Sequence, residues 1–221
     1  MTEPTAPAPV TIDVISDVVC PWCYMGKRRL AAALALRPDI PVELRWRPFQ
    51  LDPTIPPEGI DRVTYMARKF GPEKIREIHT RLEEAGREIG IPFDFDRITR
   101  SPNTLDAHRL VRWSQGPNQG AVVEALFSAY FVEGRDVSDR DLLVEIAAAN
   151  GLDPQIIRAR LEDGTDRGAV NEEVATAVRI GVSGVPFFIF AGRFGVPGAQ
   201  SSEVLAAALD KARDAEPIAT A

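Results

Sequence analysis

The stretch Ile12-Asp13-Val14-Ile15-Ser16-Asp17-Val18-Val19-Cys20-Pro21-Trp22-Cys23 decides how this chain folds. It opens as an apolar, β-branched run, which is typical of a buried strand. It ends in Cys20 and Cys23, the only two cysteines among the 221 residues, and a helix-forming sequence follows. Pro21 suits a first helical turn, because its fixed φ is already helical and the N–H that it lacks has no partner there. The stretch therefore predicts a dithiol at the junction of a strand and a helix.

The two cysteines differ in their predicted positions on that helix. The first amide groups of a helix have no partner within it, and the macrodipole places partial positive charge there. Both effects stabilise a thiolate at Cys20, lower the pKa of its thiol and make it nucleophilic. Cys23 lies about one turn further on, within reach of a disulfide. We expect Cys20 to be the attacking thiolate and the more exposed of the two, and Cys23 to be the resolving thiol.

A metal site is the alternative interpretation of the cysteine pair. A closed zinc site needs about four ligands. Only His79 and His108 could add nitrogen ligands, and neither shows ligand spacing to the cysteines. We therefore expect no metal and no tightly bound cofactor, and we interpret the pair as a redox dithiol.

Composition narrows the class of protein and its partners. A hydrophobic content of 45% and a charged content of 26% are ordinary for a globular protein. The formal net charge of −6 argues against nucleic acid as a partner. No apolar stretch approaches the roughly 20 residues that span a bilayer. The first nine residues lack the basic and apolar regions of a secretory signal. With only two cysteines, we expect a cytoplasmic protein without a membrane partner.

The secondary-structure signals divide the chain into five segments. We expect a disordered leader at 1–9, a βαβ unit at 10–58, an all-helical insertion at 59–180, a ββα unit at 181–214 and a frayed tail at 215–221. Within the insertion, Ser101 is placed to cap a helix whose first residue is Pro102. The helices expected there cover about 60–70, 72–89, 103–115, 118–133, 138–149, 154–162 and 166–180.

This order of elements matches an α/β thioredoxin-like fold with a large helical insertion between its βαβ and ββα halves. On five motifs the chain resembles the DsbA-like family of thiol–disulfide oxidoreductases, in particular its FrnE-like branch. The resemblance implies exchange through Cys20-Pro21-Trp22-Cys23 and a mixed disulfide with a substrate protein or glutathione. The motifs are Ser16-Asp17-Val18-Val19-Cys20-Pro21-Trp22-Cys23-Tyr24, Arg47-Pro48-Phe49-Gln50-Leu51, Ser101-Pro102-Asn103-Thr104-Leu105-Asp106-Ala107-His108, Gly184-Val185-Pro186-Phe187-Phe188 and Gly198-Ala199-Gln200.

The resemblance also assigns roles around the dithiol. It implies that Val185-Pro186 carries a cis peptide bond beside Cys20 and leaves the Val185 backbone free to pair with an extended peptide. The alternative is a trans proline that starts an edge strand. Strongly oxidising relatives have a histidine where this chain has Trp22, so we expect a less oxidising disulfide here. Trp22 either offers an aromatic surface to a substrate or packs inside the fold.

Four further residues are candidates for the site. Asp17 is expected to position the active-site loop, to accept protons near Cys23, or to cap the helix. His108 lies on the apolar stripe of its helix, which favours a packed histidine. The alternative for His108, together with Asn103 and Phe49, is a substrate cleft between the insertion and the thioredoxin core.

Two competing functions stay open on the sequence. One is a glutathione-dependent isomerase or transferase, similar to 2-hydroxychromene-2-carboxylate isomerases and kappa-class glutathione transferases. Those enzymes resemble this architecture but have a serine-based site without a second cysteine. The other is a non-enzymatic binding or holdase module that uses Trp22 and Phe49. Whether the chain is a monomer or a homodimer is undecided.

Overall fold

The computed structural model describes residues 8–215 and opens with a βαβ unit. Strand β1 (Val10–Ser16) leads into helix α1 (Pro21–Ala35), and strand β2 (Val42–Pro48) follows. The two strands are parallel, with Val10 opposite Val42 and Ser16 opposite Pro48. The strand-to-helix junction predicted from the opening stretch is confirmed. The predicted leader and tail lie mostly at 1–7 and 216–221, outside the described residues.

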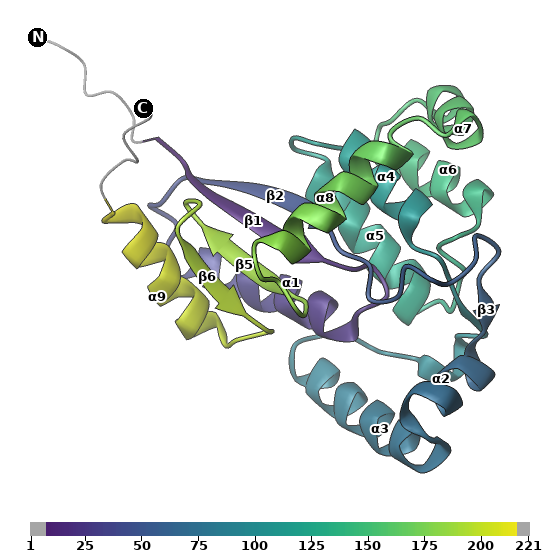
Figure 1. Ribbon diagram of the computed structural model, residues 1–221. Coiled ribbons are helices and arrows are strands. Elements are labelled where there is room, and N and C mark those ends of the chain that lie inside the picture. The colour runs from purple at the N-terminus through teal and green to yellow at the C-terminus, as the bar shows by residue number, and fades with distance from the viewer. Residues whose placement is uncertain (1–7, 216–221) are drawn as a thin grey trace, which may run out of the picture.

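The C-terminal half completes the sheet. Strands β5 (Phe187–Phe190) and β6 (Phe194–Pro197) form an antiparallel pair, and β5 pairs antiparallel with β1. The sheet order is therefore β2-β1-β5-β6, as Figure 1 shows. Helix α9 (Ser202–Arg213) begins at Ser201, whose hydroxyl accepts a hydrogen bond from the Val204 amide at 3.4 Å. This is the predicted ββα unit, and the α/β thioredoxin-like fold is confirmed.

Alternation along β1 separates the two faces of the sheet. Ile12 and Val14 are buried in the main core cluster with α1 and α9, whereas Ile15 joins a smaller cluster with Ala177 of helix α8 (Arg167–Arg179). Successive side chains of a strand point to opposite faces, so Asp13 shares the face of Ile15. There its carboxylate is 2.7 Å from Arg47 Nε of β2. Asp13 thus lies at a polar part of the sheet and not beside the dithiol.

The segment between the two halves is helical as predicted, with one exception. Its helices are α2 (Arg62–Phe70), α3 (Pro72–Glu88), α4 (Leu105–Trp113), α5 (Gln119–Phe131), α6 (Arg140–Ala149), α7 (Pro154–Asp163) and α8 (Arg167–Arg179), with a 3-10 turn at Phe95–Arg97. The exception is a two-stranded ladder of β3 (Ile60–Asp61) and β4 (Arg100–Ser101). A strand of two residues is too short to show an alternation of apolar and polar side chains, so the sequence does not predict this ladder.

The predicted cap of α4 is wrong. Ser101 lies in β4 and its hydroxyl has no hydrogen-bond partner. The helix begins three residues beyond Pro102, at Leu105. The Leu105 amide donates to Asn103 Oδ1 at 2.9 Å. Thr104 is the N-cap residue of α4 and its side chain makes no capping hydrogen bond, while the β3–β4 ladder holds Ser101 in extended backbone.

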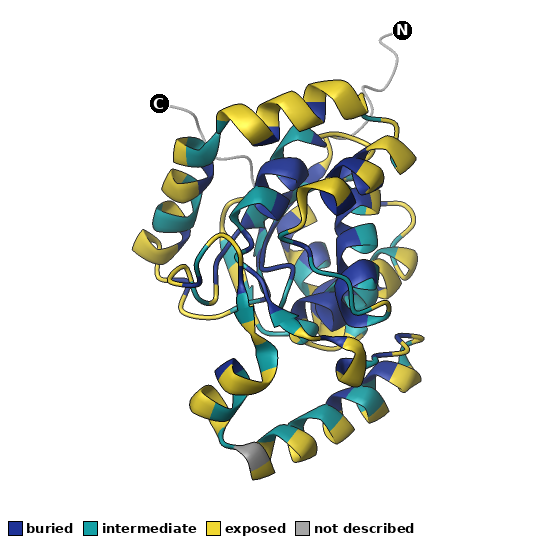
Figure 2. Cartoon of the chain, turned by 90° about the vertical axis from the view of Figure 1, so that its right-hand side faces the viewer, coloured by how far each residue is buried: buried dark blue, intermediate teal, exposed yellow. Residues whose placement is uncertain are grey.

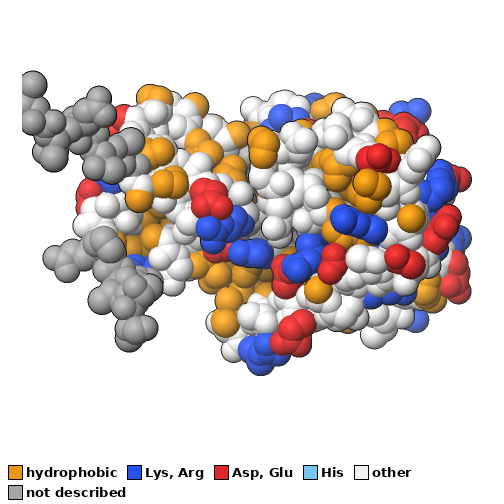
Figure 3. Space-filling model, turned by 90° about the horizontal axis from the view of Figure 1, so that it is seen from above, with side chains coloured by type: hydrophobic (Ala, Val, Ile, Leu, Met, Phe, Trp, Pro, Cys, Tyr) orange, Lys and Arg blue, Asp and Glu red, His pale blue; other side chains and the backbone are white. Residues whose placement is uncertain are grey.

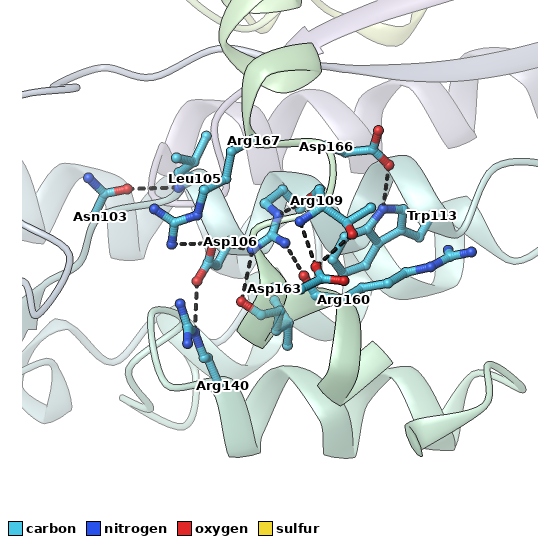
Figure 4. Close-up of polar contacts among 12 residues, drawn as sticks. Asn103, Leu105, Asp106, Arg109, Trp113, Arg140, Arg160, Asp163, Asp166 and Arg167 are labelled. Carbon is cyan, nitrogen blue, oxygen red and sulfur yellow. Dashed lines mark hydrogen bonds and ion pairs between the residues drawn. The ribbon is translucent and has the colours of Figure 1, made fainter. Parts of the chain in front are cut away.

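A buried arginine fixes α4 inside the insertion. Arg109 is fully buried, and its guanidinium donates to the Asp106 carboxylate at 2.7 Å and to the Thr165 carbonyl at 2.6 Å. It also donates to the carbonyls of Arg160 and Leu161. Figure 4 shows Arg109 between Asp106 of α4 and Arg160 near the C-terminal end of α7. Because so many polar groups are satisfied together, α4 is held rigidly.

Burial is uneven between the body and the α2–α3 hairpin. Figure 2 shows the buried residues concentrated in the sheet and the helices packed on it, while the hairpin is mostly intermediate or exposed. The hairpin contacts the body through Tyr65 and Leu82, which are 8% and 3% exposed. Within residues 8–215, no helix combines the length and the apolar character needed to cross a membrane.

Candidate active site

The dithiol lies at the N-terminus of α1, as predicted. Cys20 is the N-cap residue, with φ −97° and ψ 112°, and Pro21 is the first helical residue. The Cys20 carbonyl accepts hydrogen bonds from the amides of Cys23 at 3.0 Å and Tyr24 at 3.3 Å. Both cysteines are free thiols. The Cys20 side chain therefore lies where the unpaired amides of the helix begin.

The exposure of these residues differs from the expectation in one respect. Cys20 is 4% exposed and Cys23 is 1% exposed, so both thiols are buried. Cys20 is the more accessible only by a small margin, because the loop around Val185 covers it. Trp22 is 48% exposed, so its ring is not a core packing group.

The loop before β5 brings Val185 and Pro186 to the dithiol. The Val185–Pro186 peptide bond is cis, as predicted. The Cys20 Sγ lies 3.6 Å from the Val185 carbonyl oxygen, although 165 residues separate them. The Pro186 ring packs against Gly26 of α1, where an added Cβ would lie 2.9 Å from Pro186 Cγ. The trans, edge-strand alternative for this proline is therefore wrong.

Cys23 lies behind Cys20 in a less polar environment. Burial, followed by the contact with the Cys20 sulfur, raises the pKa of Cys23 well above its usual value. The two cysteines thus have different surroundings, and Cys23 remains a protonated thiol at neutral pH.

Asp17 is a buried carboxylate with partners from two other segments. It is 1% exposed. Its Oδ2 accepts a hydrogen bond from the Leu51 amide at 2.8 Å, and its Oδ1 lies 3.3 Å from His108 Nε2. Its backbone carbonyl accepts from the Cys20 amide at 3.0 Å. The carboxylate does not cap α1, so that alternative is wrong, and a role in proton transfer stays a prediction.

His108 is both packed and polar. It is 4% exposed, in keeping with the packed histidine favoured by the sequence, yet its ring nitrogen faces Asp17. The sequence interpretation missed this contact. A histidine on the apolar stripe of one helix and an aspartate beside a dithiol were the signals, but nothing local joins residues 91 positions apart.

Asn103 and Phe49, two candidates for the substrate cleft, make contacts within the fold. The Asn103 side-chain Nδ2 donates a hydrogen bond to the Ile55 carbonyl at 2.6 Å, and Asn103 Oδ1 accepts one from Gln50 Nε2 at 3.4 Å. Phe49 is 9% exposed and packs in the cluster of Ile15. These contacts join the segment after β2 to the start of α4. Contact of Asn103, Phe49 or His108 with a substrate stays a prediction.

Charge around the molecule is mixed in sign. On the face shown in Figure 3, Lys and Arg side chains alternate with Asp and Glu side chains, and neither sign covers a broad area. Among residues 8–215, no group of three His, Cys, Asp or Glu side chains is placed to hold a metal ion.

Comparison with known proteins places this geometry in a family. The model of the DsbA-like thioredoxin domain matches residues 11–210, so the chain belongs to the DsbA-like thioredoxin family. It is similar to the uncharacterized protein YwbO of Bacillus subtilis, with 28% identity over 202 residues, which are 90% of this chain and 96% of that protein. It is also similar to the crystal structure of a probable DsbA oxidoreductase from Streptomyces coelicolor. That match has 31% identity, a TM-score of 0.85 and coverage of 96% of this chain and 94% of the other.

More distant structures share the fold alone. A 2-hydroxychromene-2-carboxylate isomerase matches with a TM-score of 0.70 and 19% identity, covering 91% of this chain and 95% of that one. The cytosolic disulfide reductase DsbM from Pseudomonas aeruginosa, solved with glutathione, matches with a TM-score of 0.59 and 21% identity, covering 92% and 95%. The architecture therefore occurs in proteins named for different reactions, and the function must be argued from the site.

Proposed function

We propose that this protein is a thiol–disulfide oxidoreductase that acts through Cys20-Pro21-Trp22-Cys23. One observation carries the proposal: Cys20 caps the N-terminus of α1, and its Sγ lies 3.6 Å from the Val185 carbonyl in the loop of Pro186. The helix terminus favours a thiolate at Cys20. The adjacent backbone offers an edge along which an extended peptide can pair.

The reaction has two exchange steps. The Cys20 thiolate attacks one sulfur of a substrate disulfide, a Cys20–substrate disulfide forms, and the other substrate sulfur leaves as a thiolate. The Cys23 sulfur then attacks Cys20 Sγ and displaces the bound substrate sulfur. The products are a Cys20–Cys23 disulfide and a reduced substrate dithiol. The same steps in reverse oxidise a substrate.

The surroundings of the dithiol favour a substrate with an exposed disulfide and apolar neighbours. Trp22 is 48% exposed next to Cys20 and provides an aromatic surface. The fold shared with DsbM, which was solved with glutathione, supports glutathione as a second substrate or redox partner. We place this activity in the cytoplasm, where a dithiol pair is more useful for catalysis than for structure.

The glutathione-dependent isomerase or transferase is the alternative. In such an enzyme the thiolate of glutathione performs the chemistry, and the protein needs no second cysteine. Cys23 would then have no role, although it lies against Cys20 at the start of α1. The cysteine pair therefore favours thiol–disulfide exchange.

The test is insulin reduction by dithiothreitol with wild type, Cys20→Ser and Cys23→Ser. We expect Cys20→Ser to abolish turnover and Cys23→Ser to accumulate mixed disulfides at Cys20, because the adduct cannot be resolved. The double variant serves as the control for any activity that needs no protein thiol. If the double variant retains turnover, or turns over an aromatic substrate with bound glutathione, the proposed function is wrong.

A further inference from the structure

The strand order places two chain segments on opposite sides of the turn that carries Cys20. In the sheet, β2 and β5 are the two neighbours of β1, as Figure 1 shows. Strand β2 runs parallel to β1 and β5 runs antiparallel, so the residues after β2 and the residues before β5 both lie at the end of β1 that leads to Cys20. Val185 therefore borders the turn on one side, and Leu51 borders it on the other.

Backbone contacts fix the Leu51 segment to that turn. The Leu51 amide donates to Asp17 Oδ2 at 2.8 Å, and the Phe49 amide donates to the Ser16 carbonyl at 3.0 Å. The Cys20 amide donates to the Asp17 carbonyl at 3.0 Å. Asp17 thus bonds to Leu51 through its side chain and to Cys20 through its backbone, and one residue links the leucine to the attacking cysteine.

The residues before Leu51 are anchored in the fold, whereas its own side chain is not covered. Gln50 and Phe49 are 8% and 9% exposed. Gln50 Nε2 donates to Asn103 Oδ1 at 3.4 Å, and Phe49 packs in the smaller core cluster, against which Val185 also lies. The Leu51 side chain, by contrast, is 40% exposed. Because its backbone is already held, contact with a substrate costs this segment little conformational entropy.

We propose that Leu51 is a specificity-determining residue that contacts the side chain next to the reacting cysteine of an extended polypeptide. The proposal rests on the proposed thiol–disulfide exchange and names its substrate class, a cysteine with an apolar neighbour. A polypeptide that pairs with the Val185 backbone and presents its sulfur to Cys20 reaches the turn from the β5 side. Neighbouring strands lie about 4.8 Å apart and an extended chain advances about 3.3 Å per residue, so the first or second residue beyond the cysteine reaches Leu51.

The exposed leucine favours an apolar neighbour over a charged one. When an apolar side chain covers Leu51, both lose apolar surface to water, and the gain for two partly exposed side chains corresponds to about a tenfold change in the rate constant. A glutamate in the same place would give up water against an apolar surface, which is unfavourable. The difference between the two neighbours is therefore the quantity to measure.

The test uses the full-length reduced protein and two activated peptides. Each peptide has one cysteine held in a mixed disulfide with 2-thiopyridine, and the residues on both sides of that cysteine are leucine in one peptide and glutamate in the other. The Cys20 thiolate attacks the peptide sulfur, a Cys20–peptide disulfide forms, and the 2-thiopyridine leaves as its anion and takes up a proton. Its absorbance gives the rate constant. We expect wild type to react about tenfold faster with the leucine peptide.

Variants of Leu51 should change the ratio of the two rate constants. In Leu51→Lys the apolar contact is lost and the ammonium attracts the glutamates, so the ratio should fall about tenfold or more. Leu51→Ala should lower it about threefold. Comparing ratios cancels intrinsic differences between the peptides and any general change in the Cys20 thiolate. With 2,2′-dithiodipyridine, a small neutral disulfide, Leu51→Ala should react as wild type does.

Leu36→Lys is the matched control for an added charge. Leu36 is 50% exposed at the C-cap of α1, a helix of 15 residues that begins next to Cys20. It therefore lies about 22 Å from the dithiol end of the helix. This variant should keep the wild-type ratio. Should Leu51→Lys fail to fold, Leu51→Ala and Leu36→Lys decide the question between them.

The outcomes distinguish this proposal from the proposed function. A wild-type ratio in the folded Leu51 variants, or an equal fall in Leu36→Lys, would overturn the role of Leu51 and leave the oxidoreductase intact. A ratio near one in wild type would do the same. Release of 2-thiopyridine by Cys20→Ser at the wild-type rate would instead show that Cys20 is not the attacking thiol, and the proposed function itself would fall.

Discussion

Gly26→Ala should impair disulfide exchange while changing the free energy of unfolding by no more than about 2 kcal/mol. Gly26 lies inside α1 at the point where the Pro186 ring packs on the helix. An added Cβ would lie 2.9 Å from Pro186 Cγ and 3.2 Å from Phe188 Cζ. Carbon atoms prefer about 3.5–4.0 Å, so the proline loop must shift by roughly half an ångström. Val185, whose carbonyl is 3.6 Å from Cys20 Sγ, moves with it.

Two opposing effects set the magnitude for this variant. Alanine favours an α-helix over glycine by up to about 1 kcal/mol. Overpacking of a close-fitting contact costs about 1–3 kcal/mol. The net result is a small loss of stability, whereas the displaced loop should lower the rate of insulin reduction about tenfold. Stability is measured by urea unfolding and activity with insulin.

Gly120→Ala is the control for helix propensity. Gly120 lies in α5, and an added Cβ there would meet nothing within 4 Å. It should be as stable as wild type or slightly more stable, with full activity. If Gly26→Ala is also stabilised by about 1 kcal/mol and fully active, the loop is not packed on α1 as described, and the reasoning fails.

Two further predictions concern stability. Arg109→Met should lower the free energy of unfolding by about 3 kcal/mol, because it leaves the carbonyls of Arg160, Leu161 and Thr165 short of a donor and removes one of the arginine partners of the half-buried Asp106. Arg158→Met, which breaks an exposed pair with Asp141, should cost no more than about 1 kcal/mol in urea unfolding. Burial, then the hydrogen bond to Glu124, raises the pKa of Tyr24 from 10.0 to about 12. The unfolded chain therefore loses this proton first, and stability should fall as pH rises from about 10 to 12, with a shallower fall in Tyr24→Phe.

Strong local signals explain what the sequence predicted well. The helix expected at 72–89 runs over Pro72–Glu88, and that expected at 154–162 runs over Pro154–Asp163. Proline at the first helical position and a glycine at the end mark such boundaries. Gly164, for example, has a φ of 79° at the C-cap of α7, a left-handed conformation that favours glycine. These boundaries follow from backbone sterics within a few residues.

The parts that escaped prediction depend on distant segments. The β3–β4 ladder pairs Ile60 with Ser101, and each strand has only two residues. With Ser101 held in this ladder, α4 begins only at Leu105, and Thr104 is its N-cap residue. Propensity cannot detect a pairing that the tertiary structure imposes. The burial of Cys20 has the same origin, because the covering loop arrives from 165 residues away.

The candidate site combines a motif that the local sequence determines with contacts that distant segments of the chain provide. The dithiol and its helix lie within Val10 to Ala35, and a short fragment would contain both. The groups that contact this unit come from elsewhere: the Leu51 amide, which follows β2, and His108 of the insertion contact the Asp17 carboxylate, and the Val185 carbonyl, which precedes β5, lies beside Cys20 Sγ. Each is fixed only when its own segment has packed on the β1–α1 unit. Reactivity of the two thiols should therefore depend on complete folding, even though the motif that provides them is local.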